Sequence, residues 1–251
     1  GADELMTLAS ARRLWTPERL GGAVSAWFDA ADASTLALSG STVTTWHDRS
    51  RNAQHITSTG SPTWSASAQN GKGAVTLNGS GQYFSTIGVT VPASLDFACY
   101  AAMAPGASGG TYRCLYDNAT NPPMVWNDST SKIEANTSTA ASGISSTATC
   151  AGAWNVYAMI ERSLGANLQE VRFNGASAGT RATNNLTAGA QTLTMFNRAA
   201  ANGWLGTVGE LIFTNRFLGD DAINKLEGYL AWKWGLQWRL PATHPYLNSA
   251  P

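Results

Sequence analysis

Six residues between positions 116 and 128 have the side-chain chemistry of a sugar-binding site. Aromatic rings lie there beside amides and carboxylates, around Pro122 and Pro123. A ring face packs against the C–H groups of a sugar, and polar forks bind its hydroxyls. Ordinary turn chemistry also produces this combination, which is the alternative interpretation. The candidate glycan-binding residues are Tyr116, Asp117, Asn118, Trp126, Asn127 and Asp128.

Asp29, Asp32 and Asp48 are the candidate metal ligands. Carboxylates gathered at the rim of a β-sandwich can bind calcium, so a structural calcium ion is the one cofactor that we consider. The alternative is that Asp29 and Asp48 accept backbone hydrogen bonds in turns. The histidines have no metal-ligand spacing, and no zinc site is predicted.

Residues 205–236 give the clearest pattern of secondary structure in the chain. Residues 205–214 alternate as a strand does: Leu205, Thr207, Gly209, Leu211 and Phe213 are predicted on one face, and Val208, Glu210, Ile212 and Thr214 on the other. Helical spacing follows, with Ile223, Leu226, Leu230 and Trp234 on one stripe. The stripe predicts a helix that lies against a sheet.

The ends of this predicted helix carry the expected signals. Asp220 and Asp221 fall in the first turn, where the helix dipole favours carboxylates, and Lys233 falls in the last. Gly235 follows at the position of a left-handed C-cap.

About a dozen short strand patterns precede this stretch, with no alternating helices, which predicts an antiparallel sandwich. Charged residues are 13% of the 251-residue chain and the formal net charge is zero, so neither nucleic acid nor an anionic membrane is an expected partner. No apolar run is long enough to span a membrane, and no signal peptide is recognised.

The cysteines are too few for a disulfide framework. Cys99, Cys114 and Cys150 lie in or beside apolar runs, which favours buried free thiols. A bridge between Cys114 and Cys150 is the alternative.

The chain is predicted to have three parts: an N-terminal arm (1–21), one β-sandwich domain (22–239) and an extended tail (240–251). The arm either contacts a neighbour or packs on its own domain. The proline-rich tail can be neither helix nor central strand, so it must lie along a surface, its own or a partner's. His244, Pro245 and Tyr246 are the candidate partner contacts.

Both ends of the sandwich resemble a known family. The segments Trp27–Leu36, Val43–His55 and Asn70–Gly73 resemble the start of concanavalin A-like, laminin-G-like jelly-roll domains, and Leu226–Leu236 resembles their end. Leu240-Pro241 with His244-Pro245-Tyr246 resembles one branch, modules of bacteriophage virion proteins. The resemblance implies an all-β fold: a two-sheet antiparallel sandwich with one C-terminal amphipathic helix.

Enzymatic relatives of this fold, the laminarinase-like glycosidases, share a strand with Glu-x-Asp-x-x-Glu, which places the carboxylates on one strand face. No such triplet exists here. Glu161 and Glu170 stand on separate strands, and Glu210 follows Gly209. No Ser-His-Asp pattern or phosphate-binding loop is found either, so no enzymatic activity is predicted.

The sequence therefore favours a non-enzymatic virion structural protein, as a head decoration or as part of a tail or fibre. Its expected partners are other virion proteins, further copies of itself and a host-surface glycan. Its expected place is the virion surface, after release by lysis. The alternatives are a lectin-like carbohydrate-binding module and, least favoured, a polysaccharide-degrading glycoside hydrolase.

Overall fold

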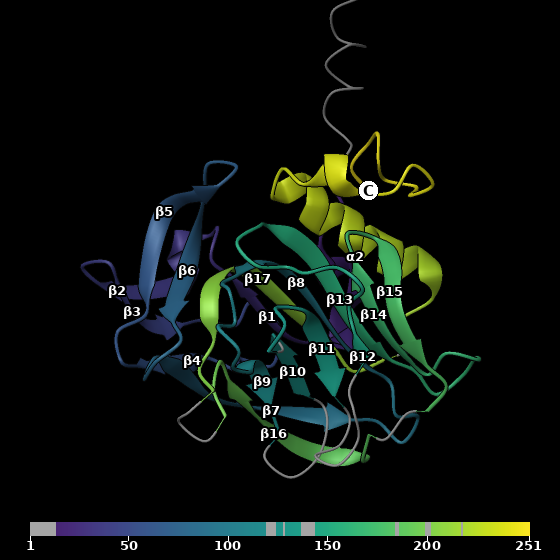
Figure 1. Ribbon diagram of the computed structural model, residues 1–251, viewed down its shortest axis with the longest axis horizontal. Helices are drawn as coiled ribbons and strands as arrows, with labels where there is room; N and C mark the ends of the chain where they lie inside the picture. The colour runs from purple at the N-terminus through teal and green to yellow at the C-terminus, as the bar shows by residue number, and fades with distance from the viewer. Residues whose placement is uncertain are drawn as a thin grey trace, which may run out of the picture.

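The computed structural model describes residues 14–118, 124–127, 129–136, 144–183, 186–198, 202–216 and 218–251, without the side chains of Met124, Trp126 and Asn136. Two antiparallel sheets pack face to face, and one α-helix covers the outer face of the first (Figure 1). The predicted antiparallel sandwich with one C-terminal helix is confirmed. No described helix is long and apolar enough to cross a membrane.

The first sheet, sheet A, is built around β17. Its strands are β1 (Val24–Asp29), β2 (Leu36–Ser39), β3 (Thr42–Trp46), β5 (Thr63–Gln69), β6 (Lys72–Asn78), β8 (Phe97–Pro105), β13 (Asn155–Glu161), β14 (Gln169–Phe173), β15 (Ala176–Arg181) and β17 (Leu205–Thr214). One edge of β17 pairs with β8; along the other, β6 pairs with its first half and β1 with its second. The strand predicted to be central is thus central.

The second sheet, sheet B, lies opposite. Its strands are β7 (Tyr83–Val91), β9 (Arg113–Asp117), β10 (Met124–Asn127), β11 (Ile133–Asn136), β12 (Ile144–Ser145) and β16 (Gly189–Met195). β4 (Ile56–Thr59) pairs with β3 of sheet A and with β7 of sheet B, and so joins the two sheets at one corner. The short helical turns are η1 (Pro17–Ala23), η2 (Ala33–Thr35) and η3 (Gln237–Arg239).

A β-bulge in β17 changes the predicted alternation. The register against β8 shifts between Val208 and Glu210, so Gly209 is the extra residue. As a result Val208 lies with Leu211 and Phe213 in the core between the sheets, whereas Glu210 faces the helix. The prediction that Val208 and Glu210 share a face was wrong, because a period of two fails across a bulge.

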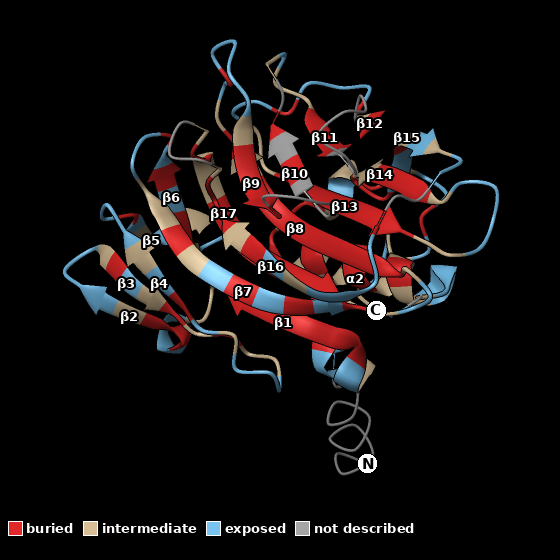
Figure 2. Cartoon of the chain, turned by 90° about the horizontal axis from the view of Figure 1, so that it is seen from below, coloured by how far each residue is buried: buried red, intermediate tan, exposed pale blue. Residues whose placement is uncertain are grey.

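The molecule has two apolar layers, an inner one between the sheets and an outer one between sheet A and α2 (Asp220–Lys233). Trp46, Phe84 and Phe196 pack in the inner layer. The outer layer contains the predicted stripe of Ile223, Leu226, Leu230 and Trp234. Strands β8 and β13 carry both layers, and Figure 2 shows them buried along most of their length.

The C-terminal end of α2 is fixed by a hairpin of sheet A. Gly235 has φ 67°, the left-handed conformation predicted for it. The Asn70-Gly71 turn between β5 and β6 has φ values of 50° and 67°, as a two-residue hairpin turn requires. Asn70 Nδ2 donates to the Lys233 carbonyl at 3.1 Å and Gln69 Nε2 donates to that of Trp234 at 3.0 Å. The hairpin thereby satisfies two of the orphan carbonyls of the helix.

The tail lies along its own domain, in turns rather than fully extended. Backbone hydrogen bonds join His244 to Pro241 and Leu247 to His244. The ring of Tyr246 packs over Gly228, and Trp232 Nε1 donates to the Tyr246 carbonyl at 2.8 Å. Because Pro251 accepts a hydrogen bond from Trp15 N, the tail also meets the segment before η1.

All three cysteines are buried thiols outside any disulfide, which confirms the thiol interpretation over the alternative bridge between Cys114 and Cys150.

Candidate functional site

A buried carboxylate, Glu210, organises the contact between sheet A and α2. Its Oε1 accepts hydrogen bonds from Trp27 Nε1 at 2.7 Å and Tyr229 OH at 2.9 Å. Its Oε2 accepts from Trp234 Nε1 at 3.0 Å and contacts Lys233 Nζ at 2.7 Å. Although the residue is 0% exposed, both oxygens are fully satisfied.

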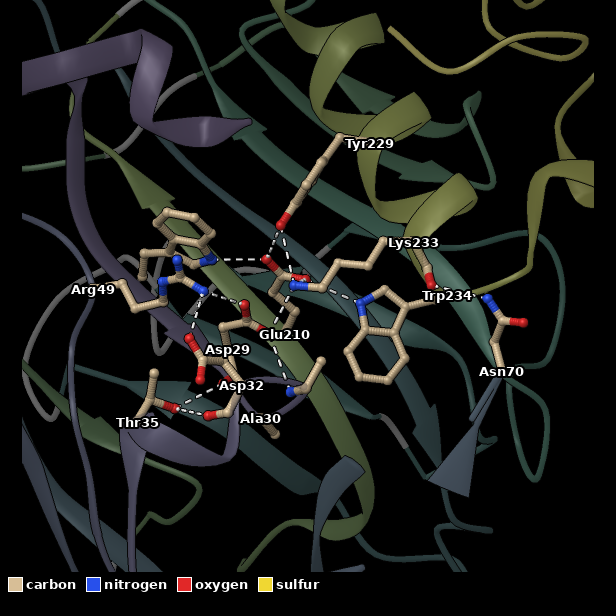
Figure 3. A network of polar contacts seen from close by, with 12 residues as sticks. Asp29, Ala30, Asp32, Thr35, Arg49, Asn70, Glu210, Tyr229, Lys233 and Trp234 are labelled. Atoms are coloured by element: carbon tan, nitrogen blue, oxygen red, sulfur yellow. Dashed lines mark hydrogen bonds and ion pairs between the residues drawn. The ribbon is translucent and has the colours of Figure 1, made fainter. Parts of the chain in front are cut away.

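A second carboxylate extends this network to the surface (Figure 3). Asp29 lies 2.7 Å from Lys233 Nζ through Oδ1 and 2.8 Å from Arg49 Nη1 through Oδ2. The Arg49 guanidinium also lies over the Trp27 ring at 4.4 Å from its centroid. Carboxylates and cations thus alternate beneath the helix, in the order Glu210, Lys233, Asp29 and Arg49.

The pKa of Glu210 is raised from its ordinary value, first by burial and then by the nearby Asp29 carboxylate. Lys233 and the Trp234 N–H oppose this by stabilising the anion. A carboxylate with no exposed atoms and four donors is not available to a substrate. The network therefore positions the side chains that contact it.

Two of the side chains that it positions, Tyr229 and Lys233, help to line a cleft of about 580 Å³ at the end of α2. The lining residues are Leu14, Trp15, Thr16, Asn70, Lys72, Tyr229, Trp232, Lys233, Ala250 and Pro251. Trp15 and Tyr229 meet edge to face at 6.2 Å between ring centroids. We call this the helix-end cleft.

Two of the three aromatic residues that line the helix-end cleft donate a hydrogen bond from their polar end to the protein. Tyr229 OH is bound to Glu210, and Trp232 Nε1 to the tail carbonyl of Tyr246. Because these bonds fix each ring by its polar end, the apolar ring bodies of the half-buried side chains are left to line the cleft. Asn70 and Lys72 supply an amide and an ammonium from the hairpin opposite.

The predicted glycan residues are brought together only in part, and those described are largely covered. Tyr116 is 1% exposed and its ring packs edge-on against Phe213 in the inner layer. Asn127 is 0% exposed and donates to the Gly106 carbonyl. In this conformation neither can offer its side chain to a sugar, because the protein already occupies both.

Asp117 and Asn118 are also buried beside β16. Asp117 lies 3.6 Å from Arg198 Nε, and burial raises the pKa of its carboxyl. Asn118 Nδ2 donates to Gln191 Oε1 at 2.6 Å. The Trp126 side chain and Asp128 lie outside the described residues, so binding through them stays a prediction.

The three candidate calcium ligands do not converge on one point. Asp48 accepts hydrogen bonds from the backbone N–H groups of Trp27, Ser50 and Gln54, as the turn interpretation predicts. Arg49 bridges Asp29 and Asp32. Among the described residues no group of three or more His, Cys, Asp or Glu side chains is placed to hold a metal ion. Asp29 and Asp32 pair with the side chains of Arg49 and Lys233, rather than facing one another across a metal site.

The candidate partner residues of the tail make contacts within the chain. His244 is buried, with Nε2 3.7 Å from Glu227 Oε2, and Tyr246 packs on α2. Pro245 is exposed. Pro245 and the exposed part of Tyr246 can thus meet a partner without displacing the tail, whereas His244 cannot.

Sequence reasoning missed both the Glu210 network and the helix-end cleft. Trp232, which lies outside the predicted apolar stripe of the helix, is half-buried and lines the cleft. One signal was present: an acid in the middle of the apolar strand 205–214 requires buried donors. Nothing local says that those donors come from residues 27, 229, 233 and 234.

No protein-family model matches the chain, and no curated protein matches it. Solved structures do. The binding domain of botulinum neurotoxin DC, in complex with rat synaptotagmin II, matches with TM-score 0.58 and 13% identity over 83% of this chain and 52% of that one. Trypanosoma rangeli sialidase in complex with sialic acid matches with TM-score 0.54 and 13% identity over 84% of this chain and 33% of that one.

Domain 4 of an extracellular arabinanase from Geobacillus stearothermophilus, in complex with arabinotriose, is similar in size. Its TM-score is 0.53 at 13% identity, over 81% of this chain and 98% of that one. The chain thus spans about a third of the sialidase and about half of the toxin chain. At these identities the likeness establishes a shared β-sandwich fold.

Proposed function

We propose that this chain is a non-enzymatic carbohydrate-binding module and that the helix-end cleft is its binding site. The observation that carries the proposal is the cleft itself: aromatic ring bodies face an amide and an ammonium, and the rings are fixed from behind by buried hydrogen bonds. A preorganised ring lowers the entropic cost of binding. Sugars are held by such a combination of apolar faces and polar forks.

The fold is compatible with this function. Structural neighbours include a domain solved with arabinotriose, a sialidase solved with sialic acid, and a type C botulinum neurotoxin whose cell entry depends on two ganglioside molecules. Those ligands belong to those proteins. They support a glycan as the class of ligand here.

A glycan array read with three tryptophan variants tests the proposal. Trp232→Ala removes a ring of the cleft, and Trp126→Ala a ring of the 116–128 region. Trp238→Ala removes a ring that is 66% exposed and outside the cleft lining, so it is the matched control. Loss of binding in Trp232→Ala alone, with unchanged melting of all three variants, supports the cleft. Loss in Trp126→Ala alone moves the site to the 116–128 region, and no binding by the parent chain contradicts the function.

The absence of activity is tested directly. Incubation with surface polysaccharides is expected to release no reducing ends. Release that persists in a repurified sample and is lost on a single carboxylate substitution would restore the glycoside hydrolase alternative.

We further propose that the module is displayed on a bacteriophage particle, where it attaches to virion proteins and to a host-surface glycan. This finer assignment is supported by the resemblance of residues 240–246 to virion modules. Antibodies against the chain are expected to label the surface of intact particles in electron micrographs. Labelling confined to broken particles, or none, would contradict it.

A further inference from the structure

The charged side chains that line the helix-end cleft are of one sign. Two of its lining side chains are lysines, and no Asp or Glu side chain belongs to the lining. The acids that lie nearest beneath it, Asp29 and Glu210, are 2% and 0% exposed and are directed at Lys233. The surface that a ligand meets is therefore aromatic and cationic, while the compensating charge is buried.

The two lysines differ in whether their ammonium groups already have partners within the protein. Lys233 Nζ contacts Asp29, Glu210 and Tyr229 OH, so its charge is already used within the protein. Lys72 forms no ion pair or side-chain hydrogen bond with any residue in the described part of the chain. It is half-buried, and no carboxylate has to be displaced before it can bind an anion.

The backbone of Lys72 is held in place. It is the first residue of β6 and pairs with Gln69 across the Asn70-Gly71 turn. The next residue, Gly73, is covered by the Trp64 indole, since a Cβ there would lie 2.5 Å from the ring. Asn70 attaches the same turn to the end of α2. Because the backbone of this turn is already fixed, binding a ligand costs little further conformational entropy there. The ammonium can therefore discriminate between ligands.

We infer that the helix-end cleft selects an anionic sugar, with Lys72 binding a carboxylate or sulfate and the rings of Trp15, Tyr229 and Trp232 packing on the sugar. This inference rests on the proposed function and gives it a ligand class. A charge-assisted hydrogen bond is about twice as strong as a neutral one, and Lys72 is the only lining ammonium without a partner among the described residues. Neutral sugars would use the rings and leave this cation unpaired.

An acidic peptide is the competing anion. The lining favours a sugar because it contains three aromatic residues, Trp15, Tyr229 and Trp232, whose rings pack well on the C–H faces of a pyranose. A poly-glutamate chain could pair with Lys72 as well, but it has no such face to pack on the rings.

The test compares an oligogalacturonate with its methyl ester, which has the same rings and no charge. A sulfated galactan oligosaccharide, which distinguishes sulfate from carboxylate recognition, and poly-glutamate complete the set. Each is titrated calorimetrically at low and at physiological salt against the parent chain, Lys72→Gln and Lys225→Gln. Lys225 loses the same charge but pairs with Asp221 on the exposed face of α2, outside the cleft lining, and is the matched control.

We expect the parent chain to bind at least one acidic sugar roughly tenfold more tightly than the methyl ester. Lys72→Gln should abolish this preference and its salt dependence without lowering the melting temperature, while Lys225→Gln retains both. Equal binding of the ester and the acids, in the parent chain and in Lys72→Gln, overturns the inference and leaves the proposed function standing. Preference for poly-glutamate overturns it in favour of a peptide, and binding of no sugar at all overturns both.

Discussion

The inner and outer layers of the sandwich each bury a glutamate, but the two carboxyl groups differ in how many hydrogen-bond and ion-pair partners they have. In the outer layer Glu210 is 0% exposed and receives a donor or cation at each of four positions. In the inner layer Glu161 is 7% exposed and accepts one hydrogen bond, from Gln169 Nε2 at 2.6 Å. Its other oxygen has no hydrogen-bond partner in the described residues.

The difference follows from what the two layers are made of. The inner layer is closed by aromatic and aliphatic side chains from two sheets, which offer few donors. The outer layer is closed by α2, whose Tyr229, Lys233 and Trp234 bring three donors to one point. A charged group can therefore organise the outer layer, whereas the inner layer tolerates an acid only in its neutral form.

The largest expected effect concerns Glu161. Burial raises the pKa of this carboxyl to about 8, against an ordinary 4.5, while Gln169 and Arg181 oppose the shift. The folded state therefore keeps a proton that the unfolded chain releases, and stability falls as pH rises from 4.5 to about 8. At about 1.4 kcal/mol per pH unit, the loss across the window is at most on the order of 5 kcal/mol.

Chemical denaturation of Glu161→Gln between pH 5 and pH 9 checks this. The glutamine carries no proton to lose, so the pH slope should flatten and the variant should be the more stable protein at pH 8. Glu18→Gln, which removes a carboxylate whose side chain is 65% exposed, is the control. If the free energy of unfolding depends on pH as strongly in Glu161→Gln as in the parent chain, Glu161 is not a buried neutral acid. The contrast between the two layers would then be wrong.

Glu210→Ala is expected to have the next largest effect. The substitution leaves two buried indole N–H groups without their acceptor and removes one of the two carboxylates that pair with Lys233. Breaking a buried ion pair from one side typically costs about 3–5 kcal/mol. Urea unfolding should show this loss, and glycan binding should weaken with it because Tyr229 loses the bond that holds its ring. Stability close to that of the parent chain would show that the network does not organise the outer layer.

Gly209→Ala tests the bulge at the point where the outer layer is tightest. A Cβ on Gly209 would lie 2.4 Å from the Trp234 ring, which is buried and cannot move aside. Overpacking of this kind costs about 1–3 kcal/mol. Gly22→Ala, where a Cβ meets nothing within 4 Å, is the control. Thermal melting that is equal in the two variants would contradict the close packing described at the bulge.

Gly228→Ala should have the smallest effect on stability and a larger one on the tail. The new Cβ would lie 2.7 Å from Tyr246, which is only partly buried and can be displaced. The gain in helix propensity, about 1 kcal/mol, offsets part of the loss. Limited proteolysis should cut the tail faster in this variant than in Asn224→Ala on the same helix. Equal rates would mean that Tyr246 does not hold the tail against α2.

Local patterns predicted most of the fold because they depend on neighbouring residues. The strand character of residues 205–214 and the stripe and caps of α2 are each encoded within a few positions. The candidate site was predicted less well. Tyr116 and Asn127 have the right chemistry for a sugar but point into the protein, and composition alone does not tell a covered side chain from an exposed one.

The sequence by itself determined an antiparallel sandwich with one C-terminal helix, since strand and helix periods are properties of short segments. Only the tertiary structure decided that residues 27, 29, 49, 210, 229, 233 and 234 form one network, and that a hairpin and the tail complete a cleft above it. The physical reason is that a period fixes the face on which a side chain lies. The register of distant strands and the layer that covers that face fix what it touches.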